Sequence, residues 1–265
     1  MPVYAYFYES RALRAVHFEV TSEDLPAGFD GFKILYISDI HHGCRGSFNL
    51  IPKIIEITRQ ESPDIIFFGG DYSEDYTREM QKECFEALRP LSAPYGKYGV
   101  LGNHDYLPCP LLTIHQMETF GKITSLNDTG VWIQKGQDRI RVFGTEYLWD
   151  QNAPLAFPRY EVSFLKKSDF VIFLPHSPDH FERFTAKEKQ KLDLVLAGHS
   201  HGGQITFFGL WAPVSVIHHK EYMTGCTKKD FGTTVITSNG VGTNVFPFRF
   251  FAPPQILCVT LKCGK

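Results

Sequence analysis

The apolar positions of this chain fall into short runs that alternate with segments of helical spacing. Residues 32–37, 65–68 and 98–101 are strand-like, being short, apolar and rich in β-branched or aromatic side chains. Between them, residues 50–58 and 77–88 repeat apolar side chains every three or four positions, which predicts two helices. The order strand, helix, strand, helix, strand is typical of parallel crossover units.

The second half of the chain continues this pattern less regularly. A hairpin is predicted around Gly136, and four further strands follow it. The predicted strands are residues 131–133, 139–143, 170–174, 193–197, 233–237 and 256–261. No segment has the composition of a linker, so we expect one α/β domain over residues 1–265. Its candidate chemistry falls within residues 39–204, and C-terminal strands and Gly- and Pro-rich turns occupy residues 205–265.

Composition excludes some classes of function. The net charge is −2, so the chain has no general basic surface for a nucleic-acid backbone. No apolar run reaches 18 residues and the N-terminus lacks the order of a secretory signal, so a cytoplasmic protein is expected. The six cysteines form no C-x-x-C pair, which is typical of reduced thiols, and we assign them no chemistry.

Five of the predicted strands end in side chains that commonly bind metals. In open α/β sheets, ligands bind beyond the carboxyl ends of the strands, and so many polar groups would be costly to bury together without a cation. Three oxygen donors with four imidazoles suit Mn²⁺, Fe or Zn²⁺ better than an all-oxygen Ca²⁺ cage. The residues, in chain order, are Asp39 and His41, Asp71, Asn103 with His104 and Asp105, His176, and His199 with His201.

In their joint order these blocks resemble the calcineurin-like metallophosphoesterase superfamily. They are DIH at 39–41, GDYS at 70–73, GNHD at 102–105, PHSPD at 175–179 and GHSHGGQ at 198–204. Each block alone is a common pattern, and the order of all five is what makes the resemblance specific. The segments GFKILYISDIHHG and NVFPFRFFAPPQI also resemble a bacterial branch that includes membrane-associated phosphodiesterases and UDP-2,3-diacylglucosamine pyrophosphatases.

The resemblance implies a fold and a metal-binding role for each of the seven candidate ligands. The fold would be a four-layer α/β sandwich, with two mixed β-sheets packed face to face, flanking helices, and the metal site at the carboxyl ends of strands. Two divalent ions would be held, with Mn expected and Fe or Zn as alternatives. Water activated by the ions would attack phosphorus. One ion would be bound by Asp39, His41 and His201, the other by Asn103, His176 and His199, with Asp71 bridging both.

Two catalytic residues follow Asn103 in the same block. His104 would act at the leaving-group oxygen, and Asp105 would hold one nitrogen of the His104 ring so that the other faces the substrate.

Other polar residues near the blocks are interpreted as structural. Glu74 and Asp75 are expected at the solvated start of a helix. We expect His42 to be a polar loop residue, and His218 and His219 to lie outside the site.

The predicted activity is hydrolysis of a phosphodiester or phosphomonoester. The alternative substrate is the pyrophosphate link of UDP-2,3-diacylglucosamine, a lipid A precursor. A metal-binding scaffold without activity is a third reading, which the complete ligand set and His104 argue against.

The sequence also leaves a membrane contact open. Residues 246–251 are either a peripheral contact at the inner membrane face or a buried strand and turn. Relatives in the bacterial branch commonly carry a hydrophobic anchor before a segment like residues 6–20. The sequence is therefore compatible with a naturally soluble protein and also with a chain that has been shortened before this segment. No pattern indicates an oligomeric state.

Overall fold

The computed structural model describes residues 2–74, 77–150, 153–209 and 211–264, and its strands form two six-stranded sheets. The first sheet has the order β1-β12-β2-β3-β4-β5. Its neighbours are parallel except for β12 and β2, which run antiparallel. The strands are β1 Arg14–Ser22, β2 Lys33–Ile37, β3 Ile65–Phe68, β4 Lys97–Gly99, β5 Thr124–Ser125 and β12 Gln255–Cys263.

The second sheet has the order β10-β11-β9-β8-β7-β6. Its four inner strands are parallel, and its two edge strands, β10 and β6, pair antiparallel. The strands are β6 Gly130–Lys135, β7 Asp138–Gly144, β8 Val171–Leu174, β9 Leu194–Ala197, β10 Gly225–Lys228 and β11 Thr234–Thr237.

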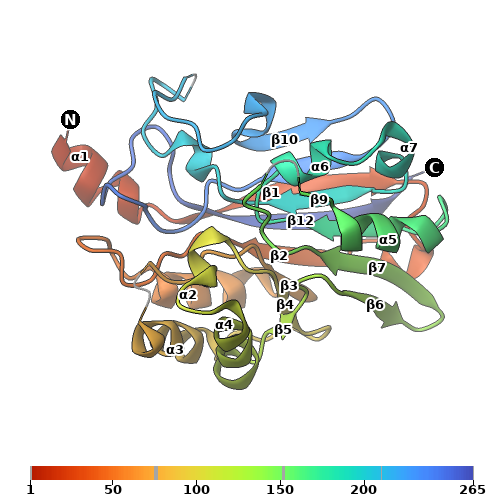
Figure 1. The fold of residues 1–265 in the computed structure, drawn as a ribbon, viewed down its shortest axis with the longest axis horizontal. Coiled ribbons are helices and arrows are strands. Elements are labelled where there is room, and N and C mark those ends of the chain that lie inside the picture. The colour runs from red at the N-terminus through yellow and green to blue at the C-terminus, as the bar shows by residue number, and fades with distance from the viewer. Residues whose placement is uncertain (1, 75–76, 151–152, 210, 265) are drawn as a thin grey trace.

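Helices cover the outer face of each sheet (Figure 1). The α-helices are α1 Pro2–Phe7, α2 Ile51–Glu61, α3 Arg78–Leu88, α4 Pro110–Gln116, α5 Ala156–Phe164, α6 Asp179–Glu182 and α7 Ala186–Lys189. Shorter turns of helix are η1 Glu9–Arg11, η2 Ala27–Phe29, η3 Asn103–Tyr106, η4 Met117–Gly121, η5 His201–Gly203 and η6 Lys220–Tyr222. No helix of the described ranges is both long and apolar enough to cross a bilayer.

Three apolar cores separate the four layers. Alternate side chains of a strand point to opposite faces, so Tyr36 of β2 packs between the sheets against residues such as Leu196, whereas Leu35 faces outward. The outward core of the first sheet includes Ile54 of α2 and Phe85 of α3. A third core lies between the second sheet and helices α5 and α6. These layers confirm the predicted sandwich of two mixed sheets flanked by helices.

Most predicted elements are present, and two differences occur in the first sheet. The crossover β2-α2-β3-α3-β4 and the β6/β7 hairpin are confirmed. Strand β1 was not predicted. It lies at the edge of its sheet, and most of its side chains are partly or fully exposed, so its apolar signal is weak. Strand β4 ends at Gly99, two residues earlier than predicted.

Candidate metal centre

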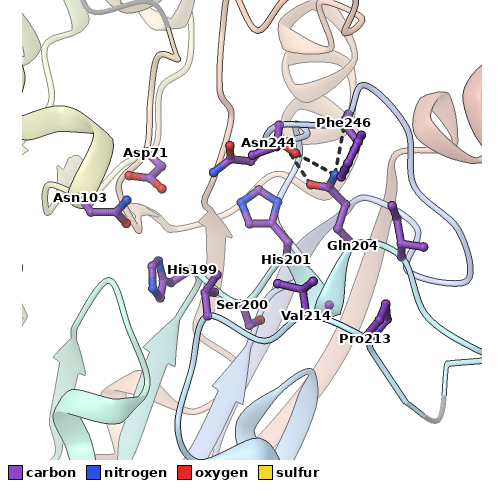
Figure 2. Close-up of a pocket in the computed structure, with 14 residues that line it drawn as sticks. Asp71, Asn103, His199, Ser200, His201, Gln204, Pro213, Val214, Asn244 and Phe246 are labelled. Atoms are coloured by element: carbon purple, nitrogen blue, oxygen red, sulfur yellow. Dashed lines mark hydrogen bonds between the residues drawn. The ribbon is translucent and has the colours of Figure 1, made fainter.

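All seven predicted ligands lie together beyond the carboxyl ends of five strands. Each follows β2, β3, β4, β8 or β9 within a few residues, and four of them are labelled in Figure 2. Non-glycine residues with positive φ concentrate in these turns, a costly conformation that commonly marks functional loops. The five ligands with positive φ are Asp39, His41, Asp71, His199 and His201.

One cluster consists of Asp39, His41 and His201. The Nε2 atoms of His41 and His201 face each other at 3.0 Å, and the Nε2 atom of His201 lies 3.4 Å from Oδ1 of Asp39. All three residues are buried. Two imidazole nitrogens that converge on a carboxylate in this way are an arrangement suited to a shared cation.

The second cluster consists of Asp71, His176 and His199, with Asn103 beside it. The Nε2 atom of His176 lies 3.1 Å from Nδ1 of His199, 3.2 Å from Oδ1 of Asn103 and 3.3 Å from Oδ2 of Asp71. The Nδ1–H of His176 donates to the carbonyl of Gly69 at 2.6 Å, which turns Nε2 toward the cluster.

Asp71 lies between the two clusters. Its Oδ2 atom is 3.6 Å from Nε2 of His41 and 3.3 Å from Nε2 of His176. Burial alone would raise the pKa of this carboxyl, but the His176 and His41 imidazoles outweigh burial and hold the pKa well below its ordinary value. Asp71 is therefore a negative group in reach of both clusters.

The imidazoles of His199 and His201 keep free lone pairs. Burial, with the neighbouring His176, lowers the pKa of His199 to about 3, and burial with the neighbouring His41 lowers the pKa of His201 well below its ordinary value. Neutral imidazole is the form that binds metals. Donor types, convergence and charge therefore fit two divalent cations.

Glu74 belongs to this site, and its prediction as the solvated start of a helix was wrong. Helix α3 begins only at Arg78, and the Glu74 side chain is 22% exposed. Its Oε2 atom lies 2.6 Å from Nδ1 of His41 and 3.1 Å from Nδ1 of His104. In the sequence, only its position three residues after Asp71 indicated that Glu74 could belong to the site. Asp75, predicted with it, lies outside the described residues.

Asp105 does not hold the His104 ring as predicted. Its buried carboxylate accepts hydrogen bonds from the backbone N–H groups of Asp71, Tyr72 and Gly102 at 2.6, 3.0 and 2.8 Å. The two ring nitrogens of His104 face Glu74 and the side-chain amide of Asn244, the latter at 3.0 Å. Asp105 instead fixes the loop after β3 against the loop after β4. Burial and Asp71 raise its pKa to about 7.

Arg249 is a further residue whose role the sequence concealed. It lies within residues 246–251, for which the sequence left a membrane contact and a buried strand and turn both open, and it is fully buried. Its guanidinium donates to the carbonyls of His201, Asn239 and Ala252 at 3.1, 2.8 and 3.0 Å, and to that of Gly242 at 2.9 Å. Burial lowers its pKa to about 10, so it stays charged at neutral pH and joins the loops after β9 and β11.

The remaining histidines near the blocks lie outside both clusters. His42 is buried, with Nε2 3.5 Å from Oε1 of Glu83. His218 and His219 donate their backbone N–H groups to the carboxylate of Asp179. Their predicted exclusion from the site agrees with these positions.

A cavity of about 460 Å³ opens from the centre. Asp71, Asn103, His199 and His201 line its inner end, as Figure 2 shows. The outer wall is apolar and consists of Ile205, Pro213, Val214, Val216, Val245 and Phe246. The cavity therefore joins a cluster of metal-type donors to an apolar mouth.

Comparison with known proteins agrees with this site. A family model described as calcineurin-like phosphoesterase matches residues 32–203. The uncharacterized metallophosphoesterase YkuE of Bacillus subtilis is 29% identical over 265 residues, which cover 98% of this chain and 89% of the relative. Phosphodiesterase YaeI of Escherichia coli is 28% identical over 235 residues, covering 87% and 82%.

A solved structure shows the same fold. The structure of a dimetal phosphatase from Danio rerio matches with a TM-score of 0.50 and 12% identity, covering 80% of this chain and 88% of that one. The family model spans well over half of the chain and contains all five blocks of candidate ligands, apart from the last residue of the fifth. The chain therefore belongs to the calcineurin-like phosphoesterase family and is a metal-dependent phosphoester hydrolase.

Proposed function

We propose that the seven clustered residues bind two divalent metal ions. Asp39, His41 and His201 would hold one, and Asn103, His176 and His199 the other. Asp71 would bridge them, which its position between the clusters supports. When bound, the ions would make water a stronger nucleophile at neutral pH and neutralise charge on the phosphoryl oxygens.

Manganese is the proposed metal, with iron or zinc as alternatives. Mixed imidazole and carboxylate donors accept all three ions, so availability contributes to the choice. Elemental analysis of the purified protein, followed by reconstitution with each ion, identifies the metal that supports the highest turnover.

His104 is proposed to donate a proton to the leaving-group oxygen. Its Nδ1 atom lies 3.1 Å from Oε2 of Glu74, so the carboxylate orients the ring. The other nitrogen, Nε2, would carry the transferred proton, with the leaving-group oxygen in place of the Asn244 amide that lies 3.0 Å from it. Glu74 acts through His104 and is a positioning residue, because it contacts the imidazole rather than the substrate.

The proposed substrate is a phosphodiester or a phosphomonoester. The observation that supports it is the convergence of metal-type donors at the inner end of one cavity, which Asn244, the neighbour of His104, also lines. Hydrolysis of bis(p-nitrophenyl) phosphate and of p-nitrophenyl phosphate with added Mn²⁺ tests this, with Asp71→Ala as the blank. Turnover of either ester, lost in the variant, supports the proposal, whereas turnover that the variant retains contradicts it.

The apolar mouth favours a second candidate, a lipid-linked phosphate ester such as UDP-2,3-diacylglucosamine. Val214 and Val245 are 70% and 80% exposed at the mouth, where an acyl chain could cover them while the phosphate reaches the centre. The double variant Val214→Ser, Val245→Ser should raise KM for this lipid in detergent and leave hydrolysis of bis(p-nitrophenyl) phosphate unchanged. An unchanged KM, or no turnover of the lipid, removes this candidate.

Exposed aromatic side chains near the mouth support a peripheral membrane contact. Phe207, Phe208 and Trp211 are exposed, and Phe208 packs on Phe251 with ring centroids 4.9 Å apart. Phe246 is also exposed and lines the cavity. Such side chains enter the interfacial region of a bilayer. Within residues 246–251, for which the sequence left surface aromatics and a buried turn both open, Phe246 and Phe251 are exposed and Phe248 and Phe250 are half-buried.

Vesicle binding tests the membrane contact. The variant Trp211→Ser, Phe246→Ser should sediment less with vesicles of bacterial phospholipids while it hydrolyses a soluble ester normally. Tyr160→Ser on α5, which is equally exposed but on another element, is the matched control and should bind as the parent does. Equal binding by all three proteins, or none by the parent, contradicts the contact.

A further inference from the structure

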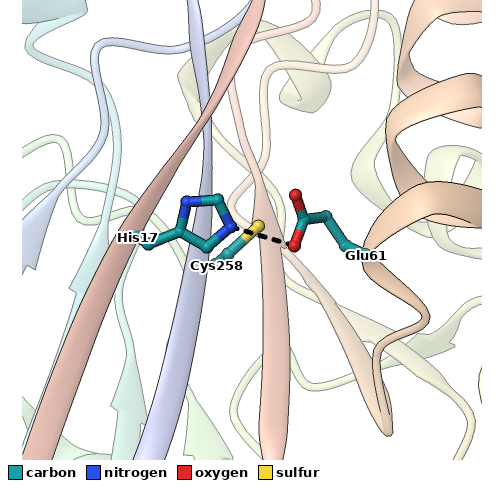
Figure 3. A group of neighbouring side chains, drawn as sticks. All are labelled: His17, Glu61 and Cys258. Atoms are coloured by element: carbon teal, nitrogen blue, oxygen red, sulfur yellow. Dashed lines mark hydrogen bonds and ion pairs between the residues drawn. The ribbon is translucent and has the colours of Figure 1, made fainter.

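A second group of metal-type side chains lies on the outer face of the first sheet, in a different place from the candidate centre. It consists of His17 of β1, Cys258 of β12 and Glu61, the last residue of α2 (Figure 3). His17 and Cys258 are direct partners in the parallel pairing of β1 and β12. Their side chains therefore project on the same face, and α2 places Glu61 over that face.

The three ligand atoms already converge. The Nε2 atom of His17 lies 2.9 Å from Oε2 of Glu61, and one nitrogen, one oxygen and the sulfur all lie within 4.8 Å of one another. Burial increases from the imidazole to the thiol, because the His17 side chain is 63% exposed and Cys258 is 8% exposed. The same three residues line one surface hollow, which Lys33 and Pro63 also border.

We propose that His17, Glu61 and Cys258 bind a single Zn²⁺ ion, with solvent at the fourth position. Imidazole, carboxylate and thiolate are the three side-chain ligands of protein zinc sites. Sulfur also favours zinc over the harder ions that an oxygen-rich site attracts. The open side of the hollow, next to the exposed imidazole, gives the ion its entry path and leaves room for a water ligand.

Binding requires one proton to leave. Burial, with the charge of Glu61, raises the pKa of the Cys258 thiol to about 12, so the free protein holds the thiol protonated. Zinc would replace that proton: the S–H bond breaks, a Zn–S bond forms, and the proton passes to solvent. Lys33 borders the hollow, and its positive charge opposes a cation there. Such a site would join β1, β12 and α2 and stabilise the folded chain by mass action.

Cobalt spectroscopy of the full chain tests this site separately from the candidate centre. Co²⁺ bound to a thiolate gives an intense ligand-to-metal charge-transfer band, and none of the seven proposed ligands of the centre is a cysteine. Co²⁺ alone should produce the band, and Zn²⁺ should abolish it by displacement. Asp71→Ala, which disrupts the candidate centre, should keep the band. No band in the parent protein overturns the proposal.

Variants assign the band to these residues. Cys258→Ser should lose it, and His17→Ala should need at least tenfold more Co²⁺ to produce it. Cys226→Ser, at an exposed cysteine on β10, is the matched control and should keep it. Lys33→Gln should lower the Co²⁺ concentration that is needed to produce the band.

His17→Ala removes an exposed side chain and should fold even if Cys258→Ser does not. A band unchanged by His17→Ala, or equally reduced by Cys226→Ser, contradicts the site.

Discussion

At the scale of single residues, one carboxylate connects two imidazoles of different roles. Oε2 of Glu74 lies close to Nδ1 of both His41, a candidate metal ligand, and His104, the proposed proton donor. The orientation of both rings therefore depends on Glu74, which is not among the seven proposed ligands. Interactions of this kind commonly change metal affinity or activity by about 10- to 100-fold when they are removed.

His104→Ala should reduce turnover on the order of 10²- to 10⁴-fold, because the leaving-group oxygen loses its proton donor. The variant should retain the parent's metal content by elemental analysis, since His104 is not among the seven proposed ligands. The loss should be greater for an alkyl ester than for a p-nitrophenyl ester, because p-nitrophenolate departs readily without being protonated. A variant that lacks metal would show that His104 has been assigned the wrong role.

Glu74→Gln should lower turnover by about 10- to 100-fold, since the amide keeps the size of the side chain but weakens the contact with Nδ1 that orients the His104 ring. Comparing kcat across esters with good and poor leaving groups checks this. The same leaving-group dependence as in His104→Ala supports a positioning role. An equal loss on every ester would show instead that Glu74 acts mainly through His41 and the metal site.

The sequence identified the candidate ligands because each follows a predicted strand directly. Asp39 and His199, for example, follow buried strands of the two different sheets, and the backbone N–H of His199 donates to Oδ1 of Asp39 at 3.0 Å. Glu74 was missed because a carboxylate beside a predicted helix is indistinguishable in sequence from one in its first turn. The contacts of Asp105 were mistaken because its backbone partners come from a different loop.

At the scale of elements, a buried cation holds the loops of the site together. The Arg249 guanidinium donates to backbone carbonyls of two loops, that of His201 after β9 and those of Asn239, Gly242 and Ala252 after β11. The His201 carbonyl also accepts the backbone N–H of Gln204, whereas the three carbonyls after β11 lie outside strands and helices. The position of His201 therefore depends on a side chain from the C-terminal segment.

Arg249→Met should destabilise the folded protein by about 3–5 kcal/mol, because the carbonyls that it bonds would stay buried without donors. Chemical unfolding of the variant and the parent measures this. Arg45→Met, at an exposed position, is the matched control and should change the unfolding free energy by less than about 0.5 kcal/mol. Equal stability of the parent and Arg249→Met would contradict the role of the guanidinium.

Apolar patterning predicted the central elements well and the edge elements poorly. Strand β3 is buried along its whole length, so its apolar run matches the observed element residue for residue. Strand β1 pairs on one side only and leaves His17 and Glu19 exposed or half-exposed, so its composition resembles that of a loop.

At the scale of the whole molecule, a partly buried carboxyl joins the two sheets. Oδ1 of Asp193, just before β9, accepts the hydroxyl of Ser22 at the end of β1 at 2.7 Å, and Oδ2 accepts the backbone N–H of Val171 at 2.8 Å. Burial, which these bonds only partly offset, raises the pKa of Asp193 from 3.8 to about 7.

Asp193→Asn should flatten the dependence of stability on pH. Between about pH 4 and pH 7 the folded parent holds this proton while the unfolded chain has released it, so the contribution of Asp193 to the free energy of unfolding falls as the pH rises. The amide can keep both hydrogen bonds without titrating. The difference in unfolding free energy between variant and parent should grow from pH 4 to pH 7. A constant difference would contradict the raised pKa.

The apolar mouth is a property of the whole molecule that the sequence did not predict. Its wall combines Ile205, Pro213, Val214 and Val216 with residues 245–246, and strands β10 and β11 lie between the two groups in the sequence. Only folding brings these segments to the same cavity, so neither segment indicated the mouth by itself.

The central claim is that metal and activity depend together on the carboxylate between the two clusters. The most direct measurement is metal content per chain alongside hydrolysis of bis(p-nitrophenyl) phosphate, in the parent and in Asp71→Ala. We predict that Asp71→Ala loses turnover together with two divalent ions per chain relative to the parent, with the fold retained by circular dichroism. Full activity in an Asp71→Ala protein that has lost these ions would contradict the two-metal account.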